Sequence, residues 1–416
     1  MRRFANLLQV LLILNGAFSL FTGLFFGRVP GDVIETLYML FASSVVMLGL
    51  LFLLCMGFNR NLPKRVYLPQ LFLIFWDLSG MWPVSSLLDQ FQAHLVASAG
   101  QVLFGFLALL YVYSLNRNSP FLTPEMFSRP GFRVGNLVRY VAGFLLLLPF
   151  CLLFFGFSLT SSYIDRSSGG FVRLGIDGLY MTERVYRQKG KTVRLASMIH
   201  IGDKDYYDDL AESISSGGTL VLAEGVTDQD GLLKGRFSYG GIADFLGLSA
   251  QEKMALDGRV IDARLLTQAD FQGTGNGRPD IIRADIDLRD FDPQTLAFIN
   301  ALGTHLLSND SFSDGYEAFS LWAQEHVTPE TNDLIMADLV TKRNQIVIGH
   351  LAAALKKYDT IVIPWGALHM VGIEKHVIDR GFLLQSSKER RSIDFRKIPF
   401  AELFDKMSAE ERPPDA

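Results

Sequence analysis

The chain has 416 residues, of which 49% are hydrophobic, a mean hydropathy of +0.23 and a formal net charge of −4. This length allows two or more domains, and the absence of a basic stripe excludes nucleic acid as an expected partner. The two cysteines, Cys55 and Cys151, both lie in hydrophobic runs. A disulfide framework, a thiolate metal site and a cysteine nucleophile are therefore excluded for the rest of the chain.

Residues 1–160 hold few charged side chains and are predicted to form a transmembrane helical domain in contact with a lipid bilayer. A membrane-spanning helix needs roughly 20 mostly apolar residues. Five segments approach that length: Leu7–Phe26, Leu37–Phe58, Leu68–Leu88, Leu95–Leu115 and Val138–Leu159. The third is the weakest, because Asp77 and Pro83 interrupt it. We predict about five helices, with the first retained rather than cleaved as a signal peptide.

The basic residues of the short connections predict the orientation of these helices, because such residues favour the cytoplasmic side. With five spans, three clusters fall on one side: Arg2 and Arg3, then Arg60, Lys64 and Arg65, then Arg117, Arg129 and Arg133. The alternate connections hold only Arg28. The N-terminus is therefore predicted in the cytoplasm and the C-terminal domain outside it, in the periplasm if the source is bacterial.

One acid, Asp77, lies well inside a predicted span. An ionisable residue at such a position is a functional candidate by default. Its neighbours Trp76 and Trp82 favour a helix-packing or interfacial role instead. The helices carry no periodic series of acids or histidines, so a proton relay or transporter is not expected.

The second half reads as an α/β domain. Residues 161–190 form a linker in which Phe171–Tyr186 is a predicted β-hairpin, and residues 191–395 follow a βα rhythm. The predicted strands are Thr192–Ile199, Thr219–Ala223 and Thr360–Pro364, and the predicted helices are Asp205–Ser215, Phe245–Leu256, Asp292–Leu307 and Leu334–Lys357. Gln272–Pro279 is a predicted loop, and residues 396–416 are a polar tail. This alternation predicts a mainly parallel sheet covered by helices.

Three polar residues follow the three apolar strands. His200 and Glu224 come directly after the first two, and His369 comes shortly after the third. Ligands in such sheets bind at the carboxyl ends of the strands. Two imidazoles and a carboxylate form a common divalent-metal site, which lowers the pKa of a bound water and polarises a carbonyl. The alternative is that each residue is a hydrogen-bonded side chain at the end of its strand.

Four sequence features together resemble the TraB/PrgY/GumN family, which includes the membrane-anchored Tiki proteases. They are His200-Ile201-Gly202, the strand that ends in Glu224, the pair Arg343-Asn344 on a helix, and the G-x-x-H-x-x-G-I motif of Gly366–Ile373. The family is related more distantly to erythromycin esterases and to the haem-binding lipoprotein ChaN. The resemblance covers roughly residues 194–382. It departs from the family at Ser197, where the first motif has glycine.

This resemblance implies a membrane-anchored, metal-dependent hydrolase, plausibly a peptidase, that uses Mn, Co or Zn. His200, Glu224 and His369 would bind the metal, with Glu224 as ligand or general base. Arg343 would stabilise an oxyanion or a substrate carboxylate, and it could instead form a buried ion pair with Glu224 or Asp285.

Two other interpretations remain open. One is a non-catalytic sensor domain on the same fold that binds haem, metal or a peptide. The other is a metal-independent, esterase-like enzyme that uses His and Glu. A divalent metal held through His200, Glu224 and His369 would separate these possibilities.

Overall fold

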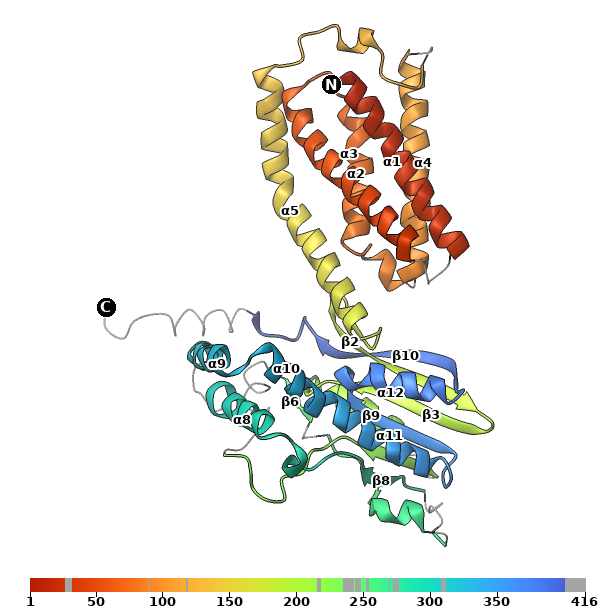
Figure 1. Ribbon diagram of the computed structural model, residues 1–416, viewed down its shortest axis with the longest axis vertical. Coiled ribbons are helices and arrows are strands. Elements are labelled where there is room, and N and C mark those ends of the chain that lie inside the picture. Colours follow the sequence, from red (N-terminus) through yellow and green to blue (C-terminus); the bar gives the residue numbers. More distant parts are fainter. Residues whose placement is uncertain are drawn as a thin grey trace, which may run out of the picture. The chain divides into compact units, whose positions relative to one another are not determined.

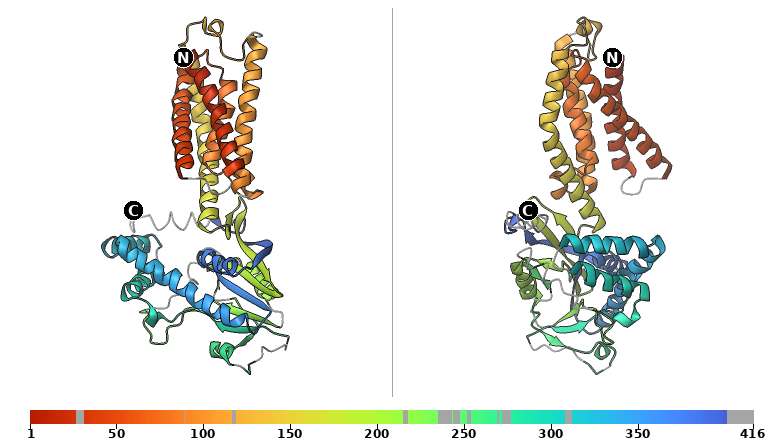
Figure 2. Two further views of the ribbon diagram at one scale, coloured as in Figure 1. Left: turned by 45° about the vertical axis from the view of Figure 1, so that its right-hand side comes forward. Right: turned by 90° about the vertical axis from the view of Figure 1, so that its left-hand side faces the viewer.

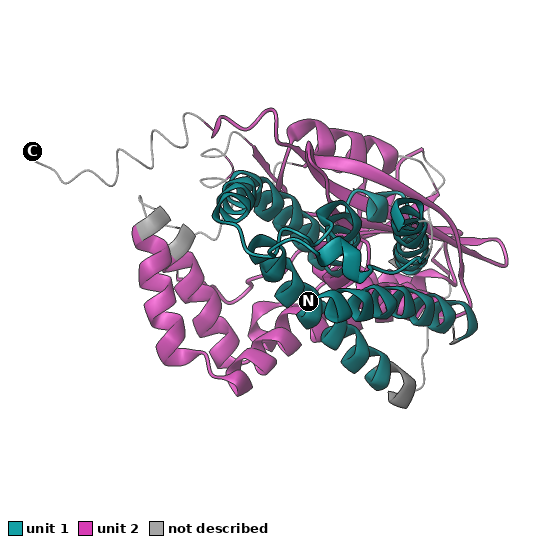
Figure 3. Cartoon of the chain, turned by 90° about the horizontal axis from the view of Figure 1, so that it is seen from above, with its two compact units in different colours: residues 1–163 teal, residues 164–416 magenta. Residues whose placement is uncertain are grey.

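The computed structural model describes residues 1–400 except 27–31, 89, 117–118, 215–217, 235–242, 244–247, 252–253, 269, 272–276 and 308–311. The chain forms two compact units, Met1–Tyr163 and Ile164–Ala416 (Figure 3). Each unit has its own buried apolar cores, so each is described by itself.

The first unit is a bundle of α-helices that run alongside one another (Figures 1 and 2). The helices are α1 (Arg2–Phe26), α2 (Asp32–Phe58), α3 (Lys64–Leu78), α4 (Gln90–Asn116) and α5 (Val134–Ser167). Four of them, α1, α2, α4 and α5, are long and apolar enough to cross a membrane. Their apolar surface is compatible with contact to a lipid bilayer.

The predicted count of five membrane spans is not confirmed, because α3 is shorter than the predicted segment Leu68–Leu88. This helix has 15 residues, contains Pro69 and ends at Leu78. At 1.5 Å per residue it is about 22 Å long, which is less than the roughly 30 Å of bilayer hydrocarbon. Its buried face, which includes Tyr67, Gln70 and Leu71, packs within the bundle.

Hydrogen bonds tie several connections together at one end of the bundle. The Asn6 side chain donates to the Leu122 carbonyl (3.1 Å) and accepts from the Leu122 amide (3.0 Å). The Arg60 amide donates to the Gly131 carbonyl (2.9 Å). The start of α1, the α2–α3 connection and the α4–α5 connection therefore meet. The described basic residues in and beside these segments, which exclude Arg117, lie at the same end of the unit.

The second unit is built on a mixed, mainly parallel sheet of eight strands in the order β1-β2-β3-β9-β5-β8-β7, with β10 also paired to β2 (Figure 1). Pairing is antiparallel among β1, β2, β3 and β10 and parallel from β3 through β9, β5 and β8 to β7. The strands are β1 (Val172–Leu174), β2 (Gly178–Gln188), β3 (Lys191–Met198), β5 (Thr219–Ala223), β7 (Arg259–Val260), β8 (Asp280–Arg283), β9 (Thr360–Gly366) and β10 (Leu383–Asp394). The predicted hairpin, the three predicted strands and the mainly parallel sheet are confirmed.

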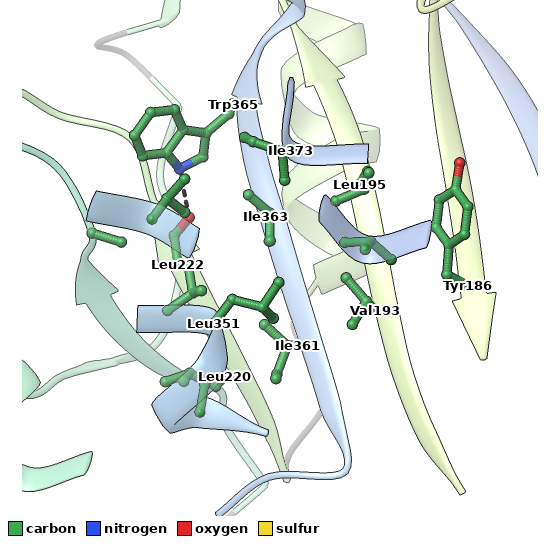
Figure 4. Close-up of a cluster of buried hydrophobic side chains, with 14 of the residues drawn as sticks. Tyr186, Val193, Leu195, Leu220, Leu222, Leu351, Ile361, Ile363, Trp365 and Ile373 are labelled. Carbon is green, nitrogen blue, oxygen red and sulfur yellow. Dashed lines mark hydrogen bonds between the residues drawn. The ribbon is translucent and has the colours of Figure 1, made fainter. Parts of the chain in front are cut away.

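Alternation along the central strands separates two apolar cores. Side chains of one parity pack against α11 (Arg343–Ala354) and α12 (Ala367–Asp379), and those of the other parity pack against α6 (Lys204–Ile214). Figure 4 shows the first core, in which the Trp365 indole N–H donates to the Leu222 carbonyl (2.9 Å). The sheet is thus covered on both faces, and its central strands are held rigidly.

The remaining predicted helices have different outcomes. Asp205–Ser215 corresponds to α6, and Asp292–Leu307 corresponds to α8 (Pro293–Ala301) with the π-helical turn η6 (Leu302–Leu307). Leu334–Lys357 corresponds to a continuous run of α10 (Pro329–Met336), the π-helical turn η7 (Ala337–Lys342) and α11, which ends at Ala354, three residues before the predicted end. Helix α9 (Phe312–His326) was not predicted.

The helix predicted at Phe245–Leu256 is wrong in its described part. Ser249–Ala250 form the short strand β6, which pairs with β4 (Ile201–Gly202) because the extended backbone there supplies ladder partners for Ile201 and Gly202. Most of the predicted loop Gln272–Pro279 and residues 401–416 of the predicted tail lie outside the described residues.

Candidate functional site

Four neighbouring parallel strands, β3, β9, β5 and β8, end at one edge of the sheet. The first polar residue after β5 is Glu224, and Asp285 follows β8 by two residues. His200 follows β3, and His369 lies on the first turn of α12 after β9. Parallel pairing therefore carries residues from four distant parts of the sequence to one edge.

At this edge, Arg343 binds two buried carboxylates. Its Nε and Nη2 atoms donate to the Oδ1 and Oδ2 atoms of Asp285 (2.9 and 2.7 Å), and Nη2 also donates to Glu224 Oε1 (2.6 Å). The side chains are 11%, 0% and 5% exposed for Arg343, Asp285 and Glu224. Burial lowers the pKa of Arg343, but the hydrogen bond to Asp285 and the charges of both carboxylates outweigh it and raise this pKa. The arginine is therefore a permanent cation with both partners in place.

The carboxylate of Glu224 is held from a second side as well. Its Oε2 atom accepts from the Gly366 amide (2.6 Å), which lies at the N-terminus of α12. The partial positive charge of a helix N-terminus favours an anion there. With Arg343 on Oε1 and a helix N-terminus on Oε2, Glu224 is fixed in orientation.

His369 faces this carboxylate as a neutral imidazole. Asn344 donates from Nδ2 to the His369 carbonyl (3.4 Å), so its Oδ1 atom is the one that accepts from His369 Nδ1 (2.9 Å). The lone pair is thereby left on Nε2, which lies 3.7 Å from Glu224 Oε1. Burial lowers the pKa of His369 from 6.5 to about 4, opposed by the charge of Glu224 and reinforced by that of Arg343. An available basic nitrogen therefore lies beside a fixed carboxylate.

His200 is exposed and is oriented in a similar way. Its Nδ1 atom is 2.7 Å from Gln251 Oε1, which can only accept, so Nδ1 donates and Nε2 carries the lone pair. The Gln251 amide also donates to the His200 carbonyl (2.8 Å). The charge of His200 acts on the pKa of His369, which it lowers. Both histidines therefore present Nε2 as a proton acceptor or ligand atom.

A metal held jointly by His200, Glu224 and His369 does not fit the described geometry. Within the described part of the chain, no group of three or more His, Cys, Asp or Glu side chains is placed to hold a metal ion. Both Glu224 oxygens are engaged, one of them by a permanent cation that would repel a second cation. The donors that remain suited to a metal are the two imidazole nitrogens.

The structure brings three of the four predicted site residues into direct contact with one another. Glu224, Arg343 and His369 form one contact cluster, and His200 lies at the same edge, where its charge acts on His369. The roles of Asn344 and Gln251 were not predicted, although Asn344 follows Arg343 in the motif. The signal available in the sequence for Asn344 was its position one residue after Arg343, which places its amide on an adjacent face of the same helix. Gln251 gave no such signal.

Comparison of the chain with models of protein families, with curated proteins and with solved structures finds no match.

Proposed function

We propose that the second unit is a hydrolase that cleaves an acyl bond, in a peptide or an ester, by acid–base chemistry of histidine and glutamate. The observation that carries this proposal is the neutral His369, whose basic Nε2 atom lies 3.7 Å from the fixed Glu224 carboxylate. A base of this kind next to a carboxylate can take a proton from water, and the carboxylate stabilises the imidazolium that forms. The burial of both side chains admits water more readily than a bulky group, so water is the nucleophile.

In the proposed reaction, the water gives its proton to His369 Nε2 while its oxygen bonds to the acyl carbon. His369 then gives this proton from Nε2 to the leaving nitrogen or oxygen as the acyl bond breaks, which restores the neutral imidazole. Arg343 holds Glu224 and Asp285 in place, so we assign it a positioning role rather than direct contact with substrate.

A metal-dependent version of the same hydrolysis is the second candidate. It is favoured by the orientation of both histidines, because amide oxygens on Nδ1 leave Nε2 as the ligand atom, as in metal sites. The motif resemblance to the TraB/PrgY/GumN family supports this version too. It would require His200 and His369 to act without Glu224 as the third ligand.

The first unit is proposed to anchor this enzyme in a membrane, with the N-terminus in the cytoplasm and the second unit outside it. The gathering of the basic connections at one end of the bundle supports this orientation, because basic residues favour the cytoplasmic face. Protease added to cells with an intact cytoplasmic membrane, from which any outer membrane has been removed, should then digest the second unit. Protection of that unit until the cells are opened would contradict the orientation.

The enzymatic proposal is tested with the full chain in detergent on peptide and ester libraries, with chelator present and then with Mn²⁺, Co²⁺ or Zn²⁺ added back. We expect chelator-resistant turnover that falls at least 10²-fold in His369→Asn, the magnitude typical of a lost general base. His326→Asn, on an exposed helix end, is the matched control. Activity that depends on added metal would support the metal-dependent version, and inertness toward both libraries would contradict hydrolysis.

A further inference from the structure

Polar side chains gather inside the first unit where α1 meets α4. The buried members are Gln9, Asn15, Ser19, Ser98 and Gln101, each no more than 8% exposed. They are spaced three to six residues apart along their helices, so each helix turns one polar face to the other. This arrangement was not visible in the sequence, where single polar residues are scattered through two apolar runs.

Two ionisable side chains lie at one end of this seam. Asp77, near the end of α3, and His94, in the first turns of α4, are separated by 3.6 Å between Oδ1 and Nδ1. The other ring nitrogen of His94, Nε2, is 2.8 Å from Ser19 Oγ. Ser19 Oγ is in turn 2.7 Å from Ser98 Oγ. The two ionisable groups are thus joined to a pair of buried hydroxyl groups.

The directions of the serine hydrogen bonds determine which ring nitrogen of His94 carries the proton when the ring is neutral. Ser98 donates its hydroxyl to the His94 carbonyl (2.8 Å), so Ser98 Oγ must accept from Ser19. Ser19 has then used its single proton and must accept from His94 Nε2. A neutral His94 therefore holds its proton on Nε2 and turns the lone pair of Nδ1 toward the Asp77 carboxylate. Two proton acceptors face each other across 3.6 Å.

We propose that Asp77 and His94, which are 29% and 39% exposed, form a binding site for one proton at the end of this buried seam. The proton leaves a hydronium ion, which becomes water, and forms a bond to His94 Nδ1. The pair then changes from a carboxylate beside a neutral imidazole to an ion pair with no net charge. Intramembrane acids are retained where such a partner is present, because an unpaired charge is costly in lipid.

The surroundings of the pair are consistent with this assignment. Besides His94, Tyr38 on α2 is a titratable group near Asp77 among the described residues. Its side chain hydrogen-bonds to Ser19. On α1 the facing side chain is Ser19 itself, which does not titrate. One turn further along the seam, Asn15 Oδ1 and Gln101 Nε2 are buried and find no protein partner within the described residues. This acceptor and donor suit a water molecule next to the hydroxyl pair.

The experiment uses the full chain labelled with ¹⁵N-histidine and reconstituted in phosphatidylcholine bilayers. Nitrogen chemical shifts distinguish the two neutral tautomers from the imidazolium, and His94→Gln identifies the His94 signals among the seven histidines. We expect a neutral ring with its proton on Nε2 at pH 8 and an imidazolium at pH 5, the interval in which histidines change charge. In Asp77→Asn the ratio of charged to neutral His94 at pH 5.5 should fall about tenfold or more, because a nearby unit charge is lost.

Two variants keep the test specific. Asp77→Glu restores a carboxylate and should return the ratio toward that of the wild type. Ser44→Ala removes a hydroxyl on α2 that bonds only within its own helix and should leave the His94 signals unchanged. A neutral His94 that carries its proton on Nδ1 at pH 8 would overturn the proposal. An unchanged charge ratio in Asp77→Asn, with the other histidine signals intact, would overturn it as well.

Discussion

The pH dependence of stability is the most direct test of the environment assigned to His369. The unfolded chain takes up a proton on this histidine as the pH falls through 6.5, whereas burial in the folded chain delays the same uptake until about pH 4. Between these values the unfolded state binds more protons, so the free energy of unfolding decreases as the pH falls. The contribution of His369 to the free energy of unfolding has its full value above pH 6.5 and is lost as the pH approaches 4.

The size of this effect follows from the two pKa values. Each unit of difference is worth ~1.4 kcal/mol, and the fall from 6.5 to about 4 therefore corresponds to ~3 kcal/mol. The comparison variant is His369→Asn, whose amide can still donate to Asn344 Oδ1 but cannot titrate. Between pH 7.5 and pH 4, the wild type should lose ~3 kcal/mol more than this variant, since other carboxylates titrate equally in both.

Native-state hydrogen exchange of the full chain supplies the measurement, because protection of the central strands β5 and β9 reports global unfolding of the second unit. His326→Asn serves as the control, since this residue is exposed. Its pH dependence should match that of the wild type. If wild type and His369→Asn lose stability in parallel within ~1 kcal/mol, the typical error of such a comparison, the imidazole is not held neutral by burial and the reasoning fails.

Two further predictions concern the groups around His369. Arg343→Met leaves Glu224 and Asp285 buried without their cation and should lower the free energy of unfolding by about 3–5 kcal/mol. Hydrogen exchange in β5 measures this loss. A loss below ~1 kcal/mol would contradict a buried ion pair. Gly372→Ala would place a methyl carbon 2.5 Å from Asn344 Nδ2 and displace that amide. The helix gain of about 1 kcal/mol offsets the lost hydrogen bond, so hydrolysis should fall with stability nearly unchanged, and unaltered turnover would count against a positioning role of Asn344.

The candidate site was predicted in part because chain order limits where strand ends can lie. Once β3, β5 and β9 are parallel neighbours, their carboxyl ends share an edge, and the residues that follow them must lie close to it. The sequence also indicated Arg343 and its buried ion-pair alternative, and the structure shows that pair with both named carboxylates. The three-ligand metal arrangement stays a prediction, because spacing along the chain says nothing of which Glu224 oxygens already accept hydrogen bonds.

By itself, the sequence determined the apolar helices, the strands and the change from an apolar to a charged half. These features depend on local composition and periodicity, which each segment carries within itself. Tertiary structure alone decided that α3 is short and sits against α4, that Glu224 is occupied by Arg343 and Gly366, and that Asp77 meets His94. Those outcomes depend on contacts between residues far apart in the chain and on which hydrogen-bond donors already have partners. Local sequence patterns predict neither of these.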